Sequence, residues 1–534
     1  MEELVREVEK RIEELSGEKF FVEFKQFGDF STSAPLRIAR KKGKEAVKLA
    51  EEWAKKIEIE GVEVKAERGF LNFFLTTGAL RYNLENITRF SAEKKRRVAI
   101  DYSSPNIAKP FSVGHLRSTV IGDSLRRIYE AFGHEVLWIN FFGDWGMQFG
   151  KLLAAYELWG KDEEIEKEPI KKLLELYVRF HREAEKNPEL EERAREWFRR
   201  LEERDRKAME LWKKFKEWSL GEFNRIYELL GVGTDYIYAG ESLFYEMGKE
   251  LVEELLREGI AKIDGGAVVI PVGDDLPPLL IRKRDGTTIY ATRDLASAIW
   301  RVKEMGAEEL VYVVGGEQRL HFQQLFRALE LMGVDVPKEH VWFGLVRLPE
   351  GKMSTRKGRV VFLEDVLREA IERVRETMRK RGVEHEEDAR KIGIGAVKFA
   401  DLKNNRTRDI VFTWDILKLE GETGPYVQYA CVRAKRIVEN ANFEARWGKM
   451  DEEEEKLARF LPRFRIAVIK ALEQKRPDLI ANYLLELADR FNKFYERNPV
   501  IESRRPQRLY VVKKVAEVLE FGLGLLGIEV PERM

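Results

Sequence analysis

The stretch over residues 97–122 has the residue types and spacing best suited to chemistry. Residues 98–100 are Val-Ala-Ile, which predicts a buried strand, and the turn formers at 103–106 must end it. A helix beginning near Gly114, beside His115, would then point free backbone N–H groups at the end of that strand. This arrangement binds phosphate in α/β sheets. The stretch therefore predicts a nucleotide-binding loop, although any strand–helix unit has a loop in this place.

A second candidate is the basic, glycine-flanked loop at 351–358, whose sequence is GKMSTRKG. Cations such as Lys352 on a flexible loop can close over a triphosphate and offset the charge that builds on a departing pyrophosphate. A basic loop is also a common solvated turn.

Tyr290 and Asp294 form a third candidate at the start of a predicted helix. Residues four apart lie on one face of a helix, so both side chains can line a single cleft. A helix cap beside a core tyrosine explains the spacing equally well. The Gly-Asp-Trp-Gly run at 143–146, which follows a predicted strand, fits either a pocket floor or a plain turn.

Length and composition restrict the class of protein. At 534 residues the chain predicts several packing units, and its net charge of +1 means that any nucleic-acid surface must be local. The single cysteine, Cys431, excludes an internal disulfide and a cysteine-rich zinc site. No apolar run reaches the roughly 18 residues that a membrane span needs, and the N-terminus is a charged amphipathic helix. We expect a soluble protein of the reducing cytoplasm, with no membrane partner.

Periodicity divides the chain into three predicted domains: 1–92, 93–405 and 406–534. The first is a small α+β unit with a helix near 3–15, a strand at 20–24, a long helix and two further strands. The second alternates strands and helices, contains a charged helical insertion at about 156–230, and resumes near 260 with two strands. The third is predicted as an α-helical bundle, with helices at about 425–441, 452–474, 477–495 and 507–524.

The end of the chain is basic. Residues 456–534 contain 16 basic and 10 acidic side chains, on helices that also carry tyrosine and phenylalanine. Such a face suits RNA backbone contact with base stacking. A dimerisation module is the alternative for this bundle.

The run DYSSPNIAKPFSVGHLRST at 101–119 resembles the first ATP motif of class I aminoacyl-tRNA synthetases, in the form found in arginyl-tRNA synthetases. The 351–358 loop resembles the second motif. Two departures stand out: Ser112 replaces the first histidine, and Thr355 replaces the second lysine. Four further segments resemble the same family, so the resemblance covers essentially the whole chain: GFLNFFL at 69–75, the Gly-Asp-Trp-Gly run, GPYVQYA at 424–430 and LGIEVPERM at 526–534.

The resemblance implies an α/β fold class: a Rossmann-type class I catalytic core with an N-terminal α+β tRNA-contacting domain and a C-terminal α-helical anticodon-binding domain. It also implies the site. Arginine binding falls to Asp101, Ser103, Asn106, Tyr290, Asp294 and Gln318; ATP binding to Ser112, Gly114, His115, His321, Lys352, Met353 and Ser354; and catalysis to His115, Lys109 and Lys352.

The activity that the resemblance implies is arginine–tRNA ligation. Arginine is activated with ATP, accompanied by Mg²⁺, and the arginyl group passes to the 3′ end of tRNA(Arg); no metal ligands are expected from the protein, and a monomer is expected. Because Ser112 replaces a signature histidine, a catalytically impaired tRNA-binding paralogue is one alternative. A class I synthetase for another amino acid is a second. Pyrophosphate exchange with each amino acid separates the three.

Overall fold

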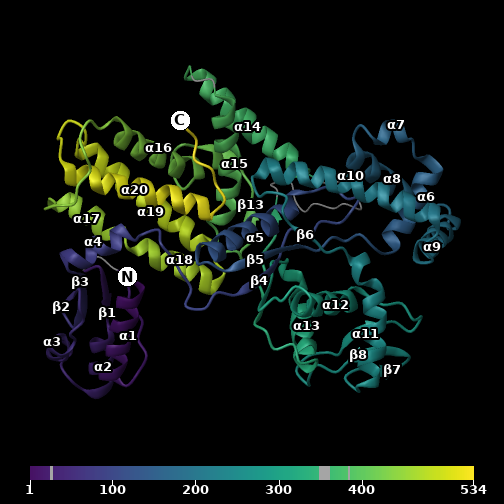
Figure 1. Cartoon of the computed structure of the whole chain (residues 1–534), viewed down its shortest axis with the longest axis horizontal. Coiled ribbons are helices and arrows are strands. Elements are labelled where there is room, and N and C mark those ends of the chain that lie inside the picture. The colour runs from purple at the N-terminus through teal and green to yellow at the C-terminus, as the bar shows by residue number, and fades with distance from the viewer. Residues whose placement is uncertain (25–27, 348–360, 383–384) are drawn as a thin grey trace. The chain divides into compact units, whose positions relative to one another are not determined.

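The structure of the protein is a computed structural model that describes residues 1–24, 28–347, 361–382 and 385–534 (Figure 1). The described chain forms two compact units. Unit 1 comprises residues 1–90, 418–525 and 529–534, and unit 2 comprises 91–417 and 526–528. The predicted loop at 351–358 lies outside the described residues.

A five-stranded parallel sheet forms the centre of unit 2. Its order is β11-β10-β4-β5-β6, so β4 lies between a strand that follows it directly and one from the second half of the unit. This is a Rossmann arrangement, with its switch point between β4 and β10. The α/β prediction is confirmed. The strands are β4 (Arg97–Asp101), β5 (Glu135–Asn140), β6 (Ile237–Tyr238), β10 (Glu309–Tyr312) and β11 (Lys338–His340).

Helices on both halves of the sheet set the positions of its loops. The helix α5 (Val113–Ala131) connects β4 to β5, and α13 (Arg319–Leu331), after the short η2 (Gly316–Gln318), connects β10 to β11. The helix α12 (Tyr290–Lys303) precedes β10 and begins at the predicted tyrosine. Apolar residues of β4, β5, β10, α12 and α13 share one buried core, which fixes α12 against the sheet.

The insertion predicted near 156–230 is helical in the structure. It consists of α6 (Met147–Trp159), α7 (Asp162–Ile165), α8 (Pro169–Ala184), α9 (Glu189–Glu202) and α10 (Arg206–Leu230). In Figure 1, α6–α9 form one group, whereas α11 (Tyr245–Arg257), α12 and α13 gather with a second sheet. The rest of unit 2 comprises η1 (Glu241–Phe244), β12 (Val346–Arg347), α14 (Leu363–Lys380), α15 (Glu386–Leu402), β13 (Ile410–Val411) and η4 (Trp414–Leu417).

That second sheet contains the two strands predicted near 260. The strands β7 (Lys262–Asp264), β8 (Ala267–Ile270) and β9 (Leu279–Arg282) pair antiparallel and lie outside the parallel sheet. The reason is the connection between β7 and β8. Gly265 and Gly266, both with positive φ, form a tight hairpin turn, which joins antiparallel neighbours and cannot make the crossover that parallel strands require.

The N-terminal part of unit 1 is an antiparallel sheet, ordered β1-β3-β2, with four helices. The strand predicted at 20–24 is wrong for these residues, which contribute an isolated bridge from Glu23 to Ser31. The strand is instead β1 (Phe30–Thr32), whose three residues are all buried, whereas Phe21 is 77% exposed. The other elements are α1 (Glu2–Ser16), α2 (Ala34–Lys42), α3 (Ala46–Lys56), β2 (Val62–Glu67), β3 (Phe70–Leu75) and α4 (Thr77–Glu85).

The C-terminal part of unit 1 is the predicted helical bundle. One predicted helix, 452–474, is two, because Pro462 cannot donate the backbone hydrogen bond that continuation requires. The helices are α16 (Gly424–Asn440), α17 (Glu452–Phe460), α18 (Arg463–Gln474), α19 (Asp478–Arg497) and α20 (Pro506–Leu525). The predicted domain boundaries at 92/93 and 405/406 stay predictions.

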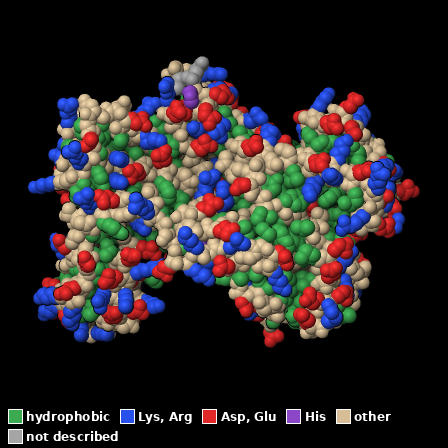
Figure 2. Space-filling model, in the orientation of Figure 1, with side chains coloured by type: hydrophobic (Ala, Val, Ile, Leu, Met, Phe, Trp, Pro, Cys, Tyr) green, Lys and Arg blue, Asp and Glu red, His purple; other side chains and the backbone are tan. Residues whose placement is uncertain are grey.

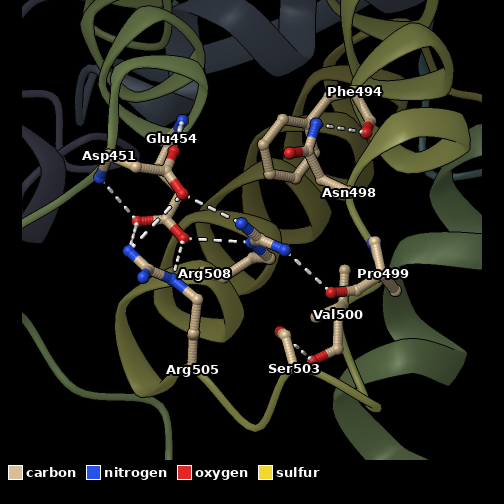
Figure 3. Close-up of polar contacts among 9 residues, drawn as sticks. All are labelled: Asp451, Glu454, Phe494, Asn498, Pro499, Val500, Ser503, Arg505 and Arg508. Carbon is tan, nitrogen blue, oxygen red and sulfur yellow. Dashed lines mark hydrogen bonds and ion pairs between the residues drawn. The ribbon is translucent and has the colours of Figure 1, made fainter.

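A buried ion-pair network holds the start of α17 against the start of α20 (Figure 3). Glu454 is fully buried and accepts two hydrogen bonds from Arg505, at 2.7 and 2.8 Å, and one from Arg508 at 3.0 Å. Arg508 also donates to Asp451, at 2.9 Å, and to the Pro499 carbonyl. Asp451 and Glu454 cap the first turn of α17 reciprocally, so the network also fixes where that helix begins.

Basic and acidic side chains are interspersed over the face of the molecule shown in Figure 2, which matches the net charge of +1. Among the described residues, no helix is both long and apolar enough to cross a membrane.

Candidate active site

A cavity of about 530 Å³ opens at the carboxyl ends of β4 and β10, the switch point of the parallel sheet. Eight of the residues predicted from sequence line it together: Asp101, Ser103, Asn106, Gly114, His115, Tyr290, Asp294 and Gln318. They come from five elements spread over more than 200 positions of the chain. Aromatic side chains of Phe141, Tyr312, Phe322 and Phe343 complete much of the apolar lining.

The loop after β4 is held in a strained shape. Ser103, Ser104 and Ala108 all have positive φ, a conformation that costs on the order of 1–3 kcal/mol for each such residue. Hydrogen bonds from other elements compensate. The Ser103 amide donates to Ser118 Oγ on α5 at 2.9 Å, and the Ser104 amide donates to Asn140 Oδ1 at the end of β5 at 3.0 Å. Strain maintained in this way is typical of a loop that presents groups to a ligand.

Asn106 packs directly against Gly143. A Cβ atom on Gly143 would lie 2.1 Å from the Asn106 side-chain oxygen, so any larger residue here would displace the Asn106 side chain. Both residues line the cavity, so the first glycine of the Gly-Asp-Trp-Gly run belongs to the pocket. Asp144 is fully buried and accepts hydrogen bonds from the amide and the hydroxyl of Ser242 at 2.8 and 2.6 Å. That carboxylate thereby fixes η1 beside the cavity.

One wall of the cavity carries three carboxylates, here called the acid wall: Asp101, Asp294 and Glu241. Each already has a charged or histidine partner within the protein, and these three partners come from α12 or α13. Arg301 donates to Asp101 at 2.6 Å, His321 Nε2 lies 2.7 Å from Asp294, and Arg293 lies 3.2 Å from Glu241. Burial raises the pKa of Asp101, and the Arg301 charge opposes that shift.

Glu241 was missed by sequence reasoning. Burial raises its pKa to about 7, Asp294 and Asp144 act in the same direction, and the Arg293 charge opposes them. A carboxyl that titrates near neutrality inside a cleft is typical of functional sites. Its signal in the sequence is weak, because it follows the two-residue strand β6, too short to predict from periodicity.

His321 was predicted to bind ATP. The structure places its ring against the acid wall, bonded to Asp294 and 4.9 Å from the Tyr290 ring. It therefore supports the residues assigned to arginine. Its ATP contact stays a prediction.

Another part of the cavity lining is the N-terminus of α5, with Gly114 and His115, here called the helix wall. The Ser112 amide donates to His115 Nδ1 at 3.0 Å, and Ser112 Oγ lies 3.2 Å from the same nitrogen. Because Nδ1 accepts, the proton of the neutral ring is on Nε2. Burial lowers the pKa of His115 to about 4, and the Lys109 charge acts in the same direction. His115 is therefore a neutral N–H donor near pH 7, beside the positive end of the helix dipole.

Lys109 belongs to the loop between the two walls, and its amide donates to the Asn106 carbonyl at 3.3 Å. Lys352, Met353 and Ser354 lie outside the described residues. Their assignment to ATP stays a prediction.

Comparison with known families accounts for nearly the whole chain. Residues 80–414 match the family described as tRNA synthetases class I (R), catalytic domain. Residues 427–534 match the DALR anticodon binding domain, and residues 1–75 match the arginyl tRNA synthetase N terminal domain.

Curated relatives and solved structures give the same result. The arginine–tRNA ligase of Clostridium perfringens is 43% identical and covers 95% of this chain and 94% of its own length. That of Clostridioides difficile is 40% identical over 99% of this chain and 98% of its own. Thermus thermophilus arginyl-tRNA synthetase superimposes with a TM-score of 0.81 at 27% identity, covering 99% of this chain and all of that one.

The parallel sheet, the loop at its switch point and the matched catalytic domain define a class I aminoacyl-tRNA synthetase. Within that class the chain belongs to the arginyl-tRNA synthetase family. Arginine, ATP and tRNA(Arg) are its substrates, and its activity is arginine–tRNA ligation. The comparisons thus favour this activity over the impaired paralogue and over a synthetase for another amino acid.

Proposed function

We propose that arginyl-adenylate forms in the 530 Å³ cavity, with the arginine side chain on the acid wall and the ATP phosphates on the helix wall. The observation that supports this assignment is the separation of charge. Asp294 acts electrostatically on both Asp101 and Glu241, so the three carboxylates lie close together, whereas the charge that acts on the neutral His115 at the α5 N-terminus is that of Lys109.

The acid wall suits a guanidinium for a geometric reason. A guanidinium is planar and always charged, and it pairs with carboxylates through two parallel hydrogen bonds. Asp294 and Glu241 approach the cavity from two elements, with Asp101 at its floor. Tyr290, which is 53% exposed, and Gln318 add a hydroxyl and an amide at the same wall, and Ser103 and Asn106 belong to the loop that faces them.

The helix wall suits a triphosphate. The positive end of the α5 dipole, where Ser112 is the N-cap residue and Gly114 lies in the first turn, favours anions. His115 Nε2–H is a donor whose charge state does not change near neutral pH. Lys109 supplies a positive charge near His115. Lys352, with Met353 and Ser354 on the second motif, is proposed to close over the leaving pyrophosphate.

The reaction needs little covalent help from the protein. One oxygen of the arginine carboxylate attacks the α-phosphorus of ATP, the bond to the β-phosphate oxygen breaks, and pyrophosphate leaves with the electron pair. A terminal ribose hydroxyl of tRNA(Arg) then attacks the arginyl carbonyl carbon, and AMP leaves. The protein positions the two substrates and balances the charge that develops on phosphate oxygens, through His115, Lys109 and Lys352.

Mg²⁺ is proposed to enter with ATP, because this ion retains several waters and binds mainly through substrate phosphates. In the described part of the chain, no group of three or more His, Cys, Asp or Glu side chains is arranged to hold a metal ion. We also propose a cytoplasmic monomer. The N-terminal α+β part and the basic bundle of unit 1 are proposed to contact tRNA(Arg).

Pyrophosphate exchange tests the arginine assignment when arginine is compared with lysine and citrulline, in the presence of tRNA(Arg). Citrulline has almost the same shape as arginine but no charge, so it would leave the carboxylates unpaired. We expect both analogues to be poorer by about 10³-fold or more in kcat/KM. Exchange with citrulline within tenfold of arginine would show that the acid wall does not read the guanidinium.

A further inference from the structure

Arg301 is a buried guanidinium directly behind the acid wall, and sequence reasoning did not single it out. It is 1% exposed and lies on α12, seven residues after Asp294 and eleven after Tyr290. These spacings place all three side chains on one face of the helix. The helix that carries the proposed arginine-binding residues therefore also carries an arginine of its own.

The contacts of Arg301 centre on Asp101. Its Nη2 donates to one Asp101 oxygen at 2.6 Å, and Ser104 Oγ donates to the other at 2.8 Å. The guanidinium carbon lies 5.0 Å from the Tyr312 ring centre and 5.8 Å from that of Phe141, and both rings line the cavity. The Asp101 carboxylate is thus fixed at both oxygens, on the cavity floor.

The rest of the Arg301 side chain is unusual for a buried arginine. Its Nε and Nη1 have no hydrogen-bond partner in the described part of the chain. An arginine retained for stability alone is expected to be fully bonded, because an unsatisfied buried donor costs about 1–3 kcal/mol. Arg508 in the bundle, by contrast, uses Nε, Nη1 and Nη2.

We infer that Arg301 is a positioning residue for arginine recognition, acting through Asp101: it sets the orientation of that carboxylate and keeps it ionised at the cavity floor. This inference rests on the proposed arginine site. The physical reason is that burial favours the neutral acid, which donates a hydrogen bond where a substrate guanidinium needs an acceptor. A guanidinium suits this task better than an ammonium, because its plane stacks on Tyr312 while one edge bonds the carboxylate.

The test compares Arg301→Met, Arg301→Lys, Asp101→Asn and the double variant Asp101→Asn/Arg301→Met in pyrophosphate exchange with tRNA(Arg). We expect Arg301→Met to lower kcat/KM for arginine by about 30- to 1000-fold, the range for one buried charge left unpaired. The KM for ATP should change less than about threefold. Arg301→Lys should recover part of the loss, since an ammonium still pairs with Asp101.

The double variant separates positioning from a general structural role. If Arg301 acts through Asp101, adding Arg301→Met to Asp101→Asn should cause no further loss in arginine kcat/KM, because the carboxylate that it holds is already absent. A further loss as large as in the parent would overturn the inference. An equal loss for ATP and arginine in Arg301→Met would also overturn it.

Thermal melting is measured for each variant, because the substitution of a buried residue can prevent folding. If Arg301→Met gives no cooperative transition, Arg301→Lys carries the test: an increase of about three- to tenfold in arginine KM, with unchanged ATP KM, supports the inference, and unchanged arginine KM overturns it. Asp294→Asn distinguishes failure of the role proposed for Arg301 from failure of the proposed arginine site. If it raises arginine KM while the Arg301 variants do not, only the role of Arg301 fails; if neither does, the proposed site itself is wrong.

Discussion

Two buried ion-pair networks in this molecule differ in how completely they are bonded. In the bundle of unit 1, Glu454 is fully buried and receives three hydrogen bonds from Arg505 and Arg508 (Figure 3). At the acid wall of unit 2, each carboxylate has one charged or histidine partner, and several donors behind it remain without one. Within the described residues these are Nε and Nη1 of Arg301, Nε of Arg293 and the hydroxyls of Tyr312 and Ser297.

The difference shows what each network is for. A saturated network fixes two helices relative to each other and has no bonding capacity left for a ligand. An incompletely bonded network lowers stability, because buried polar groups without partners are unfavourable, but it retains capacity for a polar substrate. Changes in the bundle should therefore alter the free energy of unfolding, whereas changes at the acid wall should alter kinetic constants.

The largest effect is expected from Glu454→Gln. Removing this charge leaves the buried Arg508 with Asp451 as its remaining anion and takes two charge-assisted bonds from Arg505, so the free energy of unfolding should fall by about 3 kcal/mol. Urea titration measures this free energy of unfolding. Glu452→Gln is the matched control on the same helix turn, because Glu452 is exposed, and it should be near neutral. Pyrophosphate exchange per folded molecule should be unchanged in both variants; a stable Glu454→Gln protein would contradict the role assigned to the network.

Asp294→Asn should alter arginine kinetics and leave stability almost unchanged, the reverse of Glu454→Gln. The guanidinium would lose one of its anions, so kcat/KM for arginine should fall. The loss should correspond to about 2–4 kcal/mol of transition-state stabilisation, the cost of truncating a buried charge pair. Steady-state exchange kinetics measure this loss, and ATP KM is the internal control. Stability should change little, because the Asp294 side chain is 20% exposed and the asparagine oxygen can still bond His321. Unchanged arginine constants would remove Asp294 from the site.

Sequence alone was sufficient for the local parts of this comparison. The strand, loop and helix of residues 97–131, the start of α12 at Tyr290 and the helical bundle all follow from apolar periodicity and turn residues, which act over short distances. Six residues predicted for arginine binding line one cavity, because the loop after β4 and the first turns of α12 lie at the same edge of the sheet.

The remaining features depend on contacts between distant segments. Glu241 and Arg301 have no local pattern that marks them, and their importance appears only when α12 and η1 pack beside β4. The strand β1 was predicted at the wrong residues for the same reason, because its partner β3 lies some 40 positions away in the sequence. Pairing between remote strands is set by tertiary packing, which a local pattern does not contain.

The acid wall should also change its ionisation near neutral pH, whereas the ion-pair network of the bundle should not. With the pKa of Glu241 raised to about 7 by burial, its carboxylate form predominates only above that pH. Arginine kcat/KM should therefore rise about tenfold between pH 6 and pH 8, and Glu241→Gln should remove the dependence. In the bundle, the Glu454 amide and Arg508 outweigh burial and lower the pKa of Asp451, so no titration is expected there near neutrality.

The raised pKa of Glu241 also determines the direction in which the free energy of unfolding changes with pH. The unfolded chain releases the Glu241 proton near the ordinary glutamate pKa of 4.5, before the folded protein does, so the unliganded protein should lose stability as pH rises from about 4.5 to about 7. Saturating arginine should reduce this loss, because a bound guanidinium favours the carboxylate. Urea titrations at several pH values, with and without arginine, measure both. A flat profile in arginine kinetics and in stability would show that Glu241 is ionised throughout.

The smallest effect is expected at the helix wall, from Ser112→Ala. The resemblance makes Ser112 a departure from the family motif, yet the bond that orients His115 is donated by the Ser112 backbone amide, at 3.0 Å. Alanine retains that amide. The ring should keep Nε2–H directed to the ligand, and exchange should slow by only about two- to threefold, from loss of the hydroxyl contact at 3.2 Å. His115→Ala, which removes the donor itself, should cost about 10²-fold or more under the same conditions. Should Ser112→Ala approach the loss seen for His115→Ala, the hydroxyl would have to bond phosphate directly, and the contrast between a backbone-ordered helix wall and a side-chain-ordered acid wall would no longer hold.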